Sequence, residues 1–238
     1  MRVDQIKSLR WLLAELVVIV LGILIAFQVE EWRQERENRV LEAKAFEEVL
    51  SDLDSIEMAL LRASEITKES TLGAVSLVQL IQSREGSEKE FLESIGALNV
   101  YLIGVAKSTH AYDGLLTSGR FAAVENPALT ESMRFFFTLR KPWVYSLNAS
   151  HVEHYNDLMD KISINIRTIP DEDFSSTLSS HDKISVPMNE FLKSPQVMDD
   201  LLGFVRRSEG LKELFQMLLD DIQELREDIG LHVATLES

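Results

Sequence analysis

The sequence predicts an all-α protein in which an N-terminal transmembrane helix continues into a long helix packed in an elongated helical bundle. Three observations predict this fold. Leu12–Val29 is a run of 18 residues in which only Glu15 and Gln28 are strongly polar. Glycine and proline are absent from Ile23 to Leu72, so no residue there breaks a helix. Downstream, apolar residues recur at steps of three and four, the period of a buried helix face.

Composition limits the classes of function that the chain can have. It has 238 residues, 45% of them hydrophobic, and a net charge of −15, so a real core can form. Residues 1–29 carry three basic and two acidic side chains, and the remainder therefore carries −16. Such a domain repels phosphates at long range, which argues against nucleic-acid binding. The chain has no cysteine, which excludes disulfides, thiol catalysis and cysteine-ligated zinc.

Trp11 and Trp32 bracket the apolar run and define the predicted transmembrane helix, residues 11–32. At 1.5 Å per residue they are about 31 Å apart, close to the thickness of the hydrocarbon core. Tryptophan prefers the membrane interface, so both side chains are expected to act as interfacial anchors. A cleaved signal peptide is the alternative, but Phe27-Gln28-Val29 offers no small-x-small cleavage site. We therefore expect an anchor that stays in the lipid bilayer.

Basic residues on either side of the span bear on its orientation. Arg2, Lys7 and Arg10 lie in the basic tail, residues 1–10, and further basic residues follow the span, namely Arg33, Arg36, Arg39 and Lys44. Short tails count most in the positive-inside rule, and long translocated domains count little. The pattern favours a cytoplasmic N-terminus and an exported domain, the soluble acidic helical bundle of residues 33–238.

One face of the predicted span has the features of a helix–helix contact. Steps of four and seven place Glu15, Gly22 and Ala26 on the same side. Gly22 and Ala26 form a small-xxx-small pair, which permits close approach of a second helix. A carboxylate costs about 2.5–3.5 kcal/mol at the centre of a membrane, so Glu15 is expected to bond across the contact. The alternative is that small residues are common in such helices and that Glu15, one turn inside Trp11, reaches the headgroups.

The membrane helix is expected to continue as one rod to about Ser83. Its apolar seam follows a three-four repeat, continued weakly beyond Ala63, through Phe46, Val49, Leu53, Ile56, Leu60, Ala63, Thr67, Ala74, Leu77 and Ile81. Later helices or a second chain must cover this seam, because water would destabilise it. Arg84–Ser87 should break the rod. A second helix is expected at about Glu88–Lys107, with Phe91, Ile95, Leu98, Leu102 and Val105 on one side.

The middle of the chain predicts two further helices. Thr109 is expected to cap a short helix ending at Gly119, which suits a left-handed C-terminal cap. Asn126-Pro127 predicts another helix start, with asparagine as the cap and proline in the first turn. Pro142 is expected to kink or split that helix, which then resumes and runs to about Ile166.

The last third of the chain predicts a loop and two helices. Thr168–Pro187 is rich in serine, aspartate and proline, so a long polar loop is expected there. Helices are expected at about Met188–Arg207 and Leu211–Val233. The second of them has a seam formed by Phe215, Leu218, Ile222, Leu225 and Ile229.

Two patterns have features of metal sites. His151 and His154 are three apart on a predicted helix with Asp157 one turn further, although a fourth ligand is missing and a solvated helix face is the simpler interpretation. Residues 171–182 have oxygen-bearing side chains in the order of a calcium loop, but Ser176 stands where glycine is needed and Asp182 where glutamate is usual. A solvated loop is favoured, and no metal or cofactor is predicted. Asn148-Ala-Ser150 matches a glycosylation sequon, which is frequent by chance.

The segment WLLAELVVIVLGILIAFQVEEWRQERENR resembles the N-terminus of a family of uncharacterised bacterial single-span membrane proteins. The matching residues are Glu15, Gly22-Ile23-Leu24-Ile25-Ala26, Gln28 and Trp32. Phe27 replaces the usual leucine, Ala14 stands where glycine is common, and Glu31 where asparagine is common. The stretch TSGRFAAVENPAL, after Ala111-Tyr112, also resembles a family element that precedes a long helix. The resemblance implies a helical protein with one membrane span, and the family brings no assigned reaction.

These observations favour a non-enzymatic, single-pass membrane protein that serves as a scaffold, a complex subunit or a sensor-like module. The alternative is a metal-dependent or hydrolytic membrane-anchored enzyme that uses the histidine pair or the acidic loop. The predicted partners are the lipid bilayer, a second copy bound through the anchor or the rod, and an unidentified protein. Nucleic acid is not expected to bind.

Overall fold

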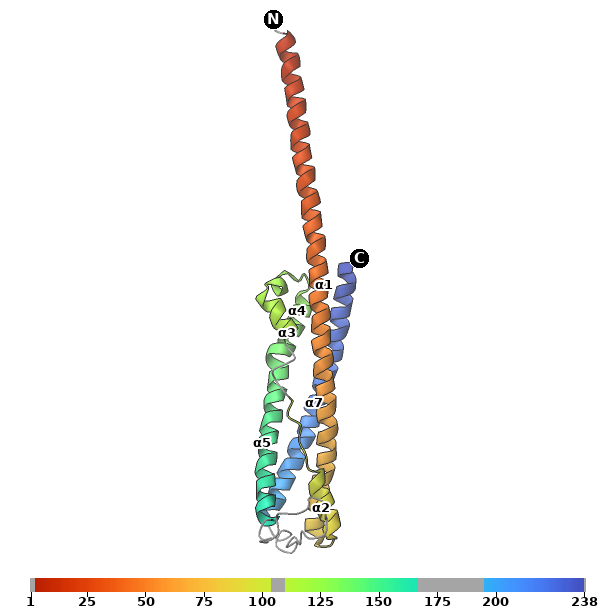
Figure 1. Ribbon diagram of the computed structural model, residues 1–238, viewed down its shortest axis with the longest axis vertical. Helices are drawn as coiled ribbons and strands as arrows, with labels where there is room; N and C mark the ends of the chain where they lie inside the picture. Colours follow the sequence, from red (N-terminus) through yellow and green to blue (C-terminus); the bar gives the residue numbers. More distant parts are fainter. Residues whose placement is uncertain (1–2, 104–109, 167–194, 238) are drawn as a thin grey trace, which may run out of the picture.

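The structure is a computed structural model that describes residues 3–103, 110–166 and 195–237. Side chains are described from Glu15 onward, except at 88, 163–166 and 237. The elements are α1 (Val3–Ser83), α2 (Glu88–Ala97), α3 (His110–Thr117), the 3₁₀ turn η1 (Arg120–Ala123), α4 (Pro127–Phe135), the π-helical turn η2 (Phe136–Arg140), α5 (Lys141–Ile166) and α7 (Pro195–Glu237). The described part of the chain is an elongated all-α bundle from which α1 projects, and this confirms the predicted class (Figure 1).

Two long helices, α1 and α7, form the antiparallel backbone of the bundle. The predicted seams of both helices are buried, since Phe46 to Ala63 on α1 and Phe215 to Ile229 on α7 are at most 3% exposed. Arg226 of α7 donates to Asp54 and Glu57 of α1 at 2.7 and 2.6 Å. Continuous helical backbone from Val3 to Ser83 confirms the predicted rod, and the absence of glycine and proline over most of it is the physical reason.

The bundle contains two apolar cores, one above the other. The upper core, at the end from which α1 projects, joins the first seam of α1 to α3, η1, α4 and the C-terminal half of α7. The lower core joins the end of α1 to α2, the end of α5 and the start of α7. Gly73 of α1 allows α2 to pack closely, because a Cβ atom there would lie 2.8 Å from the Cβ of Ala97.

The helix from α4 to α5 passes Pro142 without being split. Asn126 caps α4 through its side chain, which accepts from the backbone N–H of Leu129, and Pro127 occupies the first turn, as predicted. The five residues before Lys141 form the π-helical turn η2, and the backbone N–H of Lys141 donates to Phe136. Pro142 has no N–H to donate, and the wider turn accommodates its ring where an α-helical turn would clash. The prediction of a split is therefore wrong, and a local π turn stands directly before Lys141 and Pro142; the alternative of a kink stays a prediction.

The second helix is shorter than predicted. It ends at Ala97, and Leu98–Ile103 forms a segment without regular secondary structure. Leu98 has extended backbone angles at the cap, and Leu102, which was expected on the buried side, is 57% exposed. Side chains of α1 and α5 bond to the backbone of this segment and offer it an alternative to helical hydrogen bonds. We call residues 98–103 the strap.

The C-terminal part forms one helix where two were predicted. Gly210 lies inside α7 and costs only about 1 kcal/mol relative to alanine, less than the buried residues on either side contribute. Gly119 has φ +72 and lies two residues after α3, in the left-handed conformation expected of it. Thr109, Val105, the loop predicted at 168–187 and the start predicted at Met188 lie outside the described residues.

Candidate functional site

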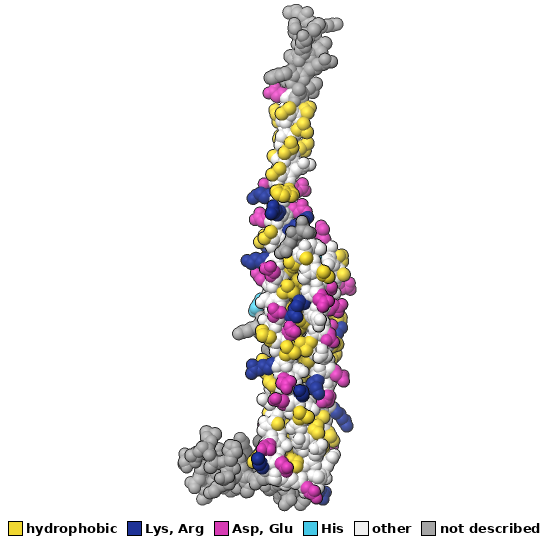
Figure 2. All heavy atoms as spheres, turned by 90° about the vertical axis from the view of Figure 1, so that its right-hand side faces the viewer, with side chains coloured by type: hydrophobic (Ala, Val, Ile, Leu, Met, Phe, Trp, Pro, Cys, Tyr) yellow, Lys and Arg dark blue, Asp and Glu magenta, His cyan; other side chains and the backbone are white. Residues whose placement is uncertain are grey.

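The first distinctive region is the part of α1 that stands clear of the bundle. Its large apolar side chains are between 47 and 69% exposed, and they are Leu16, Val17, Val18, Ile19, Val20, Leu21, Ile23, Leu24, Ile25, Phe27 and Val29. Because consecutive residues of a helix point in all directions, these side chains surround α1 on every side. Figure 2 shows this apolar surface above the bundle, with charged side chains directly below it. We call Leu16–Val29 the apolar segment.

The predicted contact face consists of Gly22 and Ala26 within this segment and Glu15 directly before it, and no described part of the chain covers it. Glu15, Gly22 and Ala26 are all exposed, and a Cβ atom added at Gly22 would meet nothing within 4 Å. Trp32 is 62% exposed, and the guanidinium of Arg36 lies 5.8 Å from the centre of its ring. The side chain of Trp11 lies outside the described residues. Within the part searched, which lacks the side chains of residues 11–14, no helical stretch is long and apolar enough to cross a membrane.

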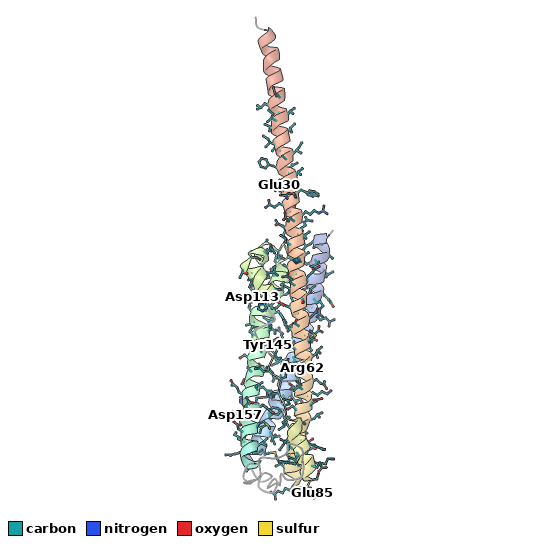
Figure 3. All side chains as sticks on the ribbon, in the orientation of Figure 1. Glu30, Arg62, Glu85, Asp113, Tyr145 and Asp157 are labelled. Atoms are coloured by element: carbon teal, nitrogen blue, oxygen red, sulfur yellow. The ribbon has the colours of Figure 1, made fainter. Side chains whose placement is uncertain are left out.

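A group of charged residues between Glu30 and Arg39 follows the apolar segment directly, and we call it the collar. Arg33 pairs with Glu30 at 2.7 Å and Arg39 with Glu35 at 3.0 Å, all on the outside of α1. Glu30 is labelled in Figure 3 on the free part of the helix, above the bundle. A groove of about 740 Å³ opens here between α1 and the end of α7, lined by Trp32, Glu35, Arg36, Arg39, Val40, Ala43, Lys44, Glu47 and Leu236. The collar marks a sharp change from apolar to charged surface along one helix.

The second distinctive region is a layer of buried polar side chains between the two cores. Along α1, α5 and α7 the apolar seams are interrupted at the boundary between the cores, by Thr67, Ser70, Thr71, Asn148, His151 and Ser208. All six are at most 5% exposed. Buried polar groups cost free energy unless they are hydrogen-bonded, so the partners of this layer decide its role.

Asn148 and Ser70 hold the strap in the polar layer. The Asn148 side-chain oxygen accepts from the backbone N–H of Ile103 at 3.0 Å, and its amide nitrogen donates to the carbonyl of Tyr101 at 3.1 Å. Ser70 Oγ accepts from Asn99 at 2.9 Å. Asn148 is 1% exposed and its side-chain amide bonds to the strap, so a bulky glycan on it is incompatible with this fold, and the sequon is a chance match. None of the sequence patterns above predicts this clamp, although a polar residue in an apolar helical register is the signal that points to it.

His151 lies in the same layer and, unlike the exposed His154, is buried. Its ring stacks on Phe204 with centroids 4.7 Å apart, and Nε2 lies 3.4 Å from Ser208 Oγ. Nδ1 is buried without a hydrogen-bond partner. Burial lowers the pKa of His151 to about 4, with smaller contributions in the same direction from the charges of Arg207 and His154. The imidazole is therefore neutral at physiological pH.

The histidine pair does not form a metal site. His154 is exposed and its Nδ1 lies 2.7 Å from the Ser150 carbonyl, whereas His151 is 2% exposed and points into the core. Asp157 is exposed on the outer side of α5, where Figure 3 labels it. Among the described residues, no group of three or more histidine, aspartate or glutamate side chains could hold a metal ion. The calcium-type pattern at 171–182 lies outside the described residues.

A buried lysine at the top of α5 was also missed by the sequence analysis. Lys141 is 2% exposed, and its ammonium lies 5.8 and 5.4 Å from the ring centres of Phe137 and Tyr145. Burial lowers its pKa to about 8, opposed by the negative charges of Asp52 and Asp113. A lysine with a pKa near neutrality can act as a nucleophile or base, but this one is enclosed by aromatic rings, which favours a structural role.

Comparison with known proteins gives no assignment. The chain matches no protein-family model, no curated protein and no solved structure. The resemblance of residues 11–39 to uncharacterised bacterial membrane proteins therefore stays a prediction. Function must be argued from the apolar segment, the collar and the bundle themselves.

Proposed function

We propose that this chain is a non-enzymatic, single-pass membrane protein whose first helix holds an acidic helical bundle beside the bilayer. In this proposal the bundle acts as a scaffold, a complex subunit or a sensor-like module. The observation that carries it is the apolar segment of α1, whose side chains are half or more exposed on most positions and meet no other part of the described chain. A helix satisfies its own backbone hydrogen bonds, so it is stable in lipid without partners, whereas in water such a surface favours aggregation.

Three further observations support the proposed anchor. The apolar segment ends at a collar of paired charges, as expected where a helix leaves the headgroup region. Trp32 lies at that boundary and is exposed. Residues 11–32 span about 31 Å, which matches a hydrocarbon core. The basic tail before the span favours a cytoplasmic N-terminus, with the bundle on the periplasmic side of an inner membrane.

The metal-dependent or hydrolytic alternative has less support. It needs His151 and His154 to converge with a carboxylate, but His151 is buried in the bundle and His154 is exposed on the surface of α5. The ring of His151 instead stacks on the ring of Phe204 inside the bundle. The proposal therefore assigns the bundle a binding or positioning role.

Charged substitutions in the apolar segment test the anchor. Leu21→Arg combined with Ile25→Arg places two guanidinium groups near the middle of the span, at a cost of roughly 5–7 kcal/mol in lipid. We expect wild type to stay in the membrane pellet after alkaline carbonate washing, and the double variant to be depleted from it. Met58→Arg, on an exposed position of the bundle, is the matched control and should pellet like wild type. Release of the wild-type chain by carbonate would refute the anchor.

A fusion experiment tests the orientation separately. Alkaline phosphatase joined after Ser238 folds only outside the cytoplasm, and we expect it to be active. A fluorescent protein that folds only in the cytoplasm should be dark at the same position. The reverse pair of results would place the bundle in the cytoplasm while leaving the anchor itself intact.

A further inference from the structure

An exposed apolar row runs along the outer side of α4, η2 and α5. It consists of Phe135, Leu139, Trp143 and Leu147, which are 45, 59, 51 and 38% exposed. They follow one another at intervals of four, and the positions between them that face the core are buried, namely Phe137, Lys141 and Tyr145. Two positions along a helix correspond to about 200° of rotation, so the row points directly away from the core. We call these four residues the outer row.

The π turn keeps the outer row on one side of the helix. In a regular α-helix, residues four apart drift by about 40° at each step, and a row of four would wind around the axis. A turn with i→i+5 hydrogen bonds has more residues per turn, so η2 rotates the row back at its centre. Such π turns occur frequently at functional sites, where a register shift re-aims side chains. The turn beside Pro142 therefore aligns an apolar surface that nothing in the described chain covers.

The charge of the molecule favours this side for contact between two copies. Residues 126–152 carry Glu131, Arg134 and Arg140 outside the core, a net of +1 because Lys141 is buried, whereas the whole chain carries −15. Two such acidic molecules repel each other at long range, and the repulsion is weakest where the local charge is least negative. Arg140, beside the row, is partly compensated by Asp221 at 3.4 Å and lies 4.8 Å from the ring centre of Phe135.

We propose that the outer row is the contact surface for a second copy of this chain, with the two bundles side by side and their long axes parallel. The inference rests on the proposed membrane anchor, which would hold all copies upright and at the same height. A two-fold axis perpendicular to the membrane then brings Leu139 against Leu139 and Trp143 against Trp143. The two rows are self-complementary because each presents large apolar side chains of similar size at the same levels.

The area of the row agrees with an association that depends on tethering. Large aromatic side chains bury about 150–250 Å² each when covered, and about half of Phe135 and Trp143 is available. The four residues together offer roughly 400 Å² per copy, about half of the roughly 800 Å² of a standard interface. A groove of about 480 Å³ at the head of the row, which includes Phe135 and Leu139 in its lining, adds to this area. Confinement to one membrane raises the effective concentration and compensates for the small area.

Cysteine crosslinking of the full chain in membranes tests the proposal directly, because the sequence has no cysteine of its own. Leu139→Cys is treated with a short bis-maleimide, and Met58→Cys on α1 and Leu72→Cys are the matched controls. The three positions are 59, 66 and 62% exposed, so they react at similar rates. We expect crosslinked dimer from Leu139→Cys and none above background from the controls. Adding Trp143→Asp to Leu139→Cys should lower the dimer yield about tenfold, as for loss of a central aromatic contact.

The possible results of the crosslinking separate the outer-row contact from the membrane anchor. Equal yields at Leu139 and Met58 in membrane-bound protein would overturn the outer-row contact and leave the anchor standing. Protein that does not pellet with membranes would refute the proposed function, and the same crosslinking of the released chain would still decide whether the row pairs. Quenching of an environment-sensitive dye at Leu139→Cys by a lipid-borne quencher, without crosslinking, would show that the row faces lipid and would also overturn the dimer.

Discussion

Protonation of His151 should make the stability of the bundle depend on pH. Its pKa is about 4 in the folded protein because of burial, against 6.5 ordinarily. The unfolded chain therefore binds the proton more tightly, and stability is fully present above about pH 6.5 and is lost as the pH falls towards 4. A difference of about 2.5 pKa units corresponds to roughly 3 kcal/mol at 1.36 kcal/mol per unit. That is a large fraction of the stability of an ordinary domain.

The measurement compares urea unfolding of the full chain in mild detergent, followed by circular dichroism, at pH 7 and pH 4. Wild type contains other titrating groups, so the informative quantity is its difference from His151→Leu. Leucine cannot be protonated, and Ser208 keeps its hydrogen bond to the Phe204 carbonyl. We expect the variant to gain about 3 kcal/mol relative to wild type between pH 7 and pH 4. His154→Leu, at an exposed position, is the control and should gain much less, because it removes only a minor contribution to the lowered pKa of His151.

A pH-independent difference between wild type and His151→Leu would refute this reasoning. It would mean that the bundle opens locally around His151 and hydrates the imidazolium at little cost, so that the folded pKa lies near the ordinary value. A gain of similar size in His154→Leu would show that the effect belongs to the surface of α5 and has nothing to do with burial. Both outcomes are resolved by the unfolding curves of the same three proteins at each pH.

Three more substitutions give expected outcomes. Gly73→Ala should destabilise the bundle by about 1–3 kcal/mol in thermal unfolding, since the new Cβ would lie 2.8 Å from the Cβ of Ala97 and 2.9 Å from the Ser94 carbonyl. The control is Gly96→Ala, which should not destabilise the bundle because its Cβ would meet nothing within 4 Å. Asn148→Ala should cost about 2–6 kcal/mol, because two backbone groups of the strap lose their partners. Gly22→Ile should weaken self-association of residues 1–40 in a membrane two-hybrid assay by about 1–2 kcal/mol if the anchor face pairs, and an unchanged signal would mark that face as lipid-exposed.

The elements that the sequence predicted correctly are those in which local and long-range signals agree. The rod from the apolar run to Ser83 lacks glycine and proline over most of its length and has a seam with a three-four repeat, and both features indicate the same helix. Asn126-Pro127 was decisive at the start of α4 because capping is a local interaction between residues three apart. The left-handed conformation of Gly119 was predicted correctly for a similar reason, since glycine adopts it with little help from the rest of the fold.

The failed predictions depend on partners that are distant in the sequence. The end of α2 is set by Asn148 and Ser70, which compete for the backbone of the strap from 29 to 47 residues away. Continuity of α7 through Gly210 depends on Phe204 and Phe215 being buried in two different cores. Lys141 and His151 look like surface residues in the sequence, and only the closure of α5 onto its neighbours buries them. No periodicity within one helix contains this information.

The polar layer bears on why these helices pack in one register. An apolar seam with a three-four repeat can slip by one heptad and still bury similar residues, so the seams of α1 and α7 alone do not define a unique alignment. In the polar layer, the hydrogen bonds of Asn148 to the strap oppose such a slip of α5. A slip would separate Asn148 from the strap and leave the N–H of Ile103 and the carbonyl of Tyr101 buried without partners, at about 1–3 kcal/mol each. The outer row depends on the same register, because Leu147 immediately precedes Asn148 on α5. Fixing Asn148 against the strap thus fixes the height at which the row is presented.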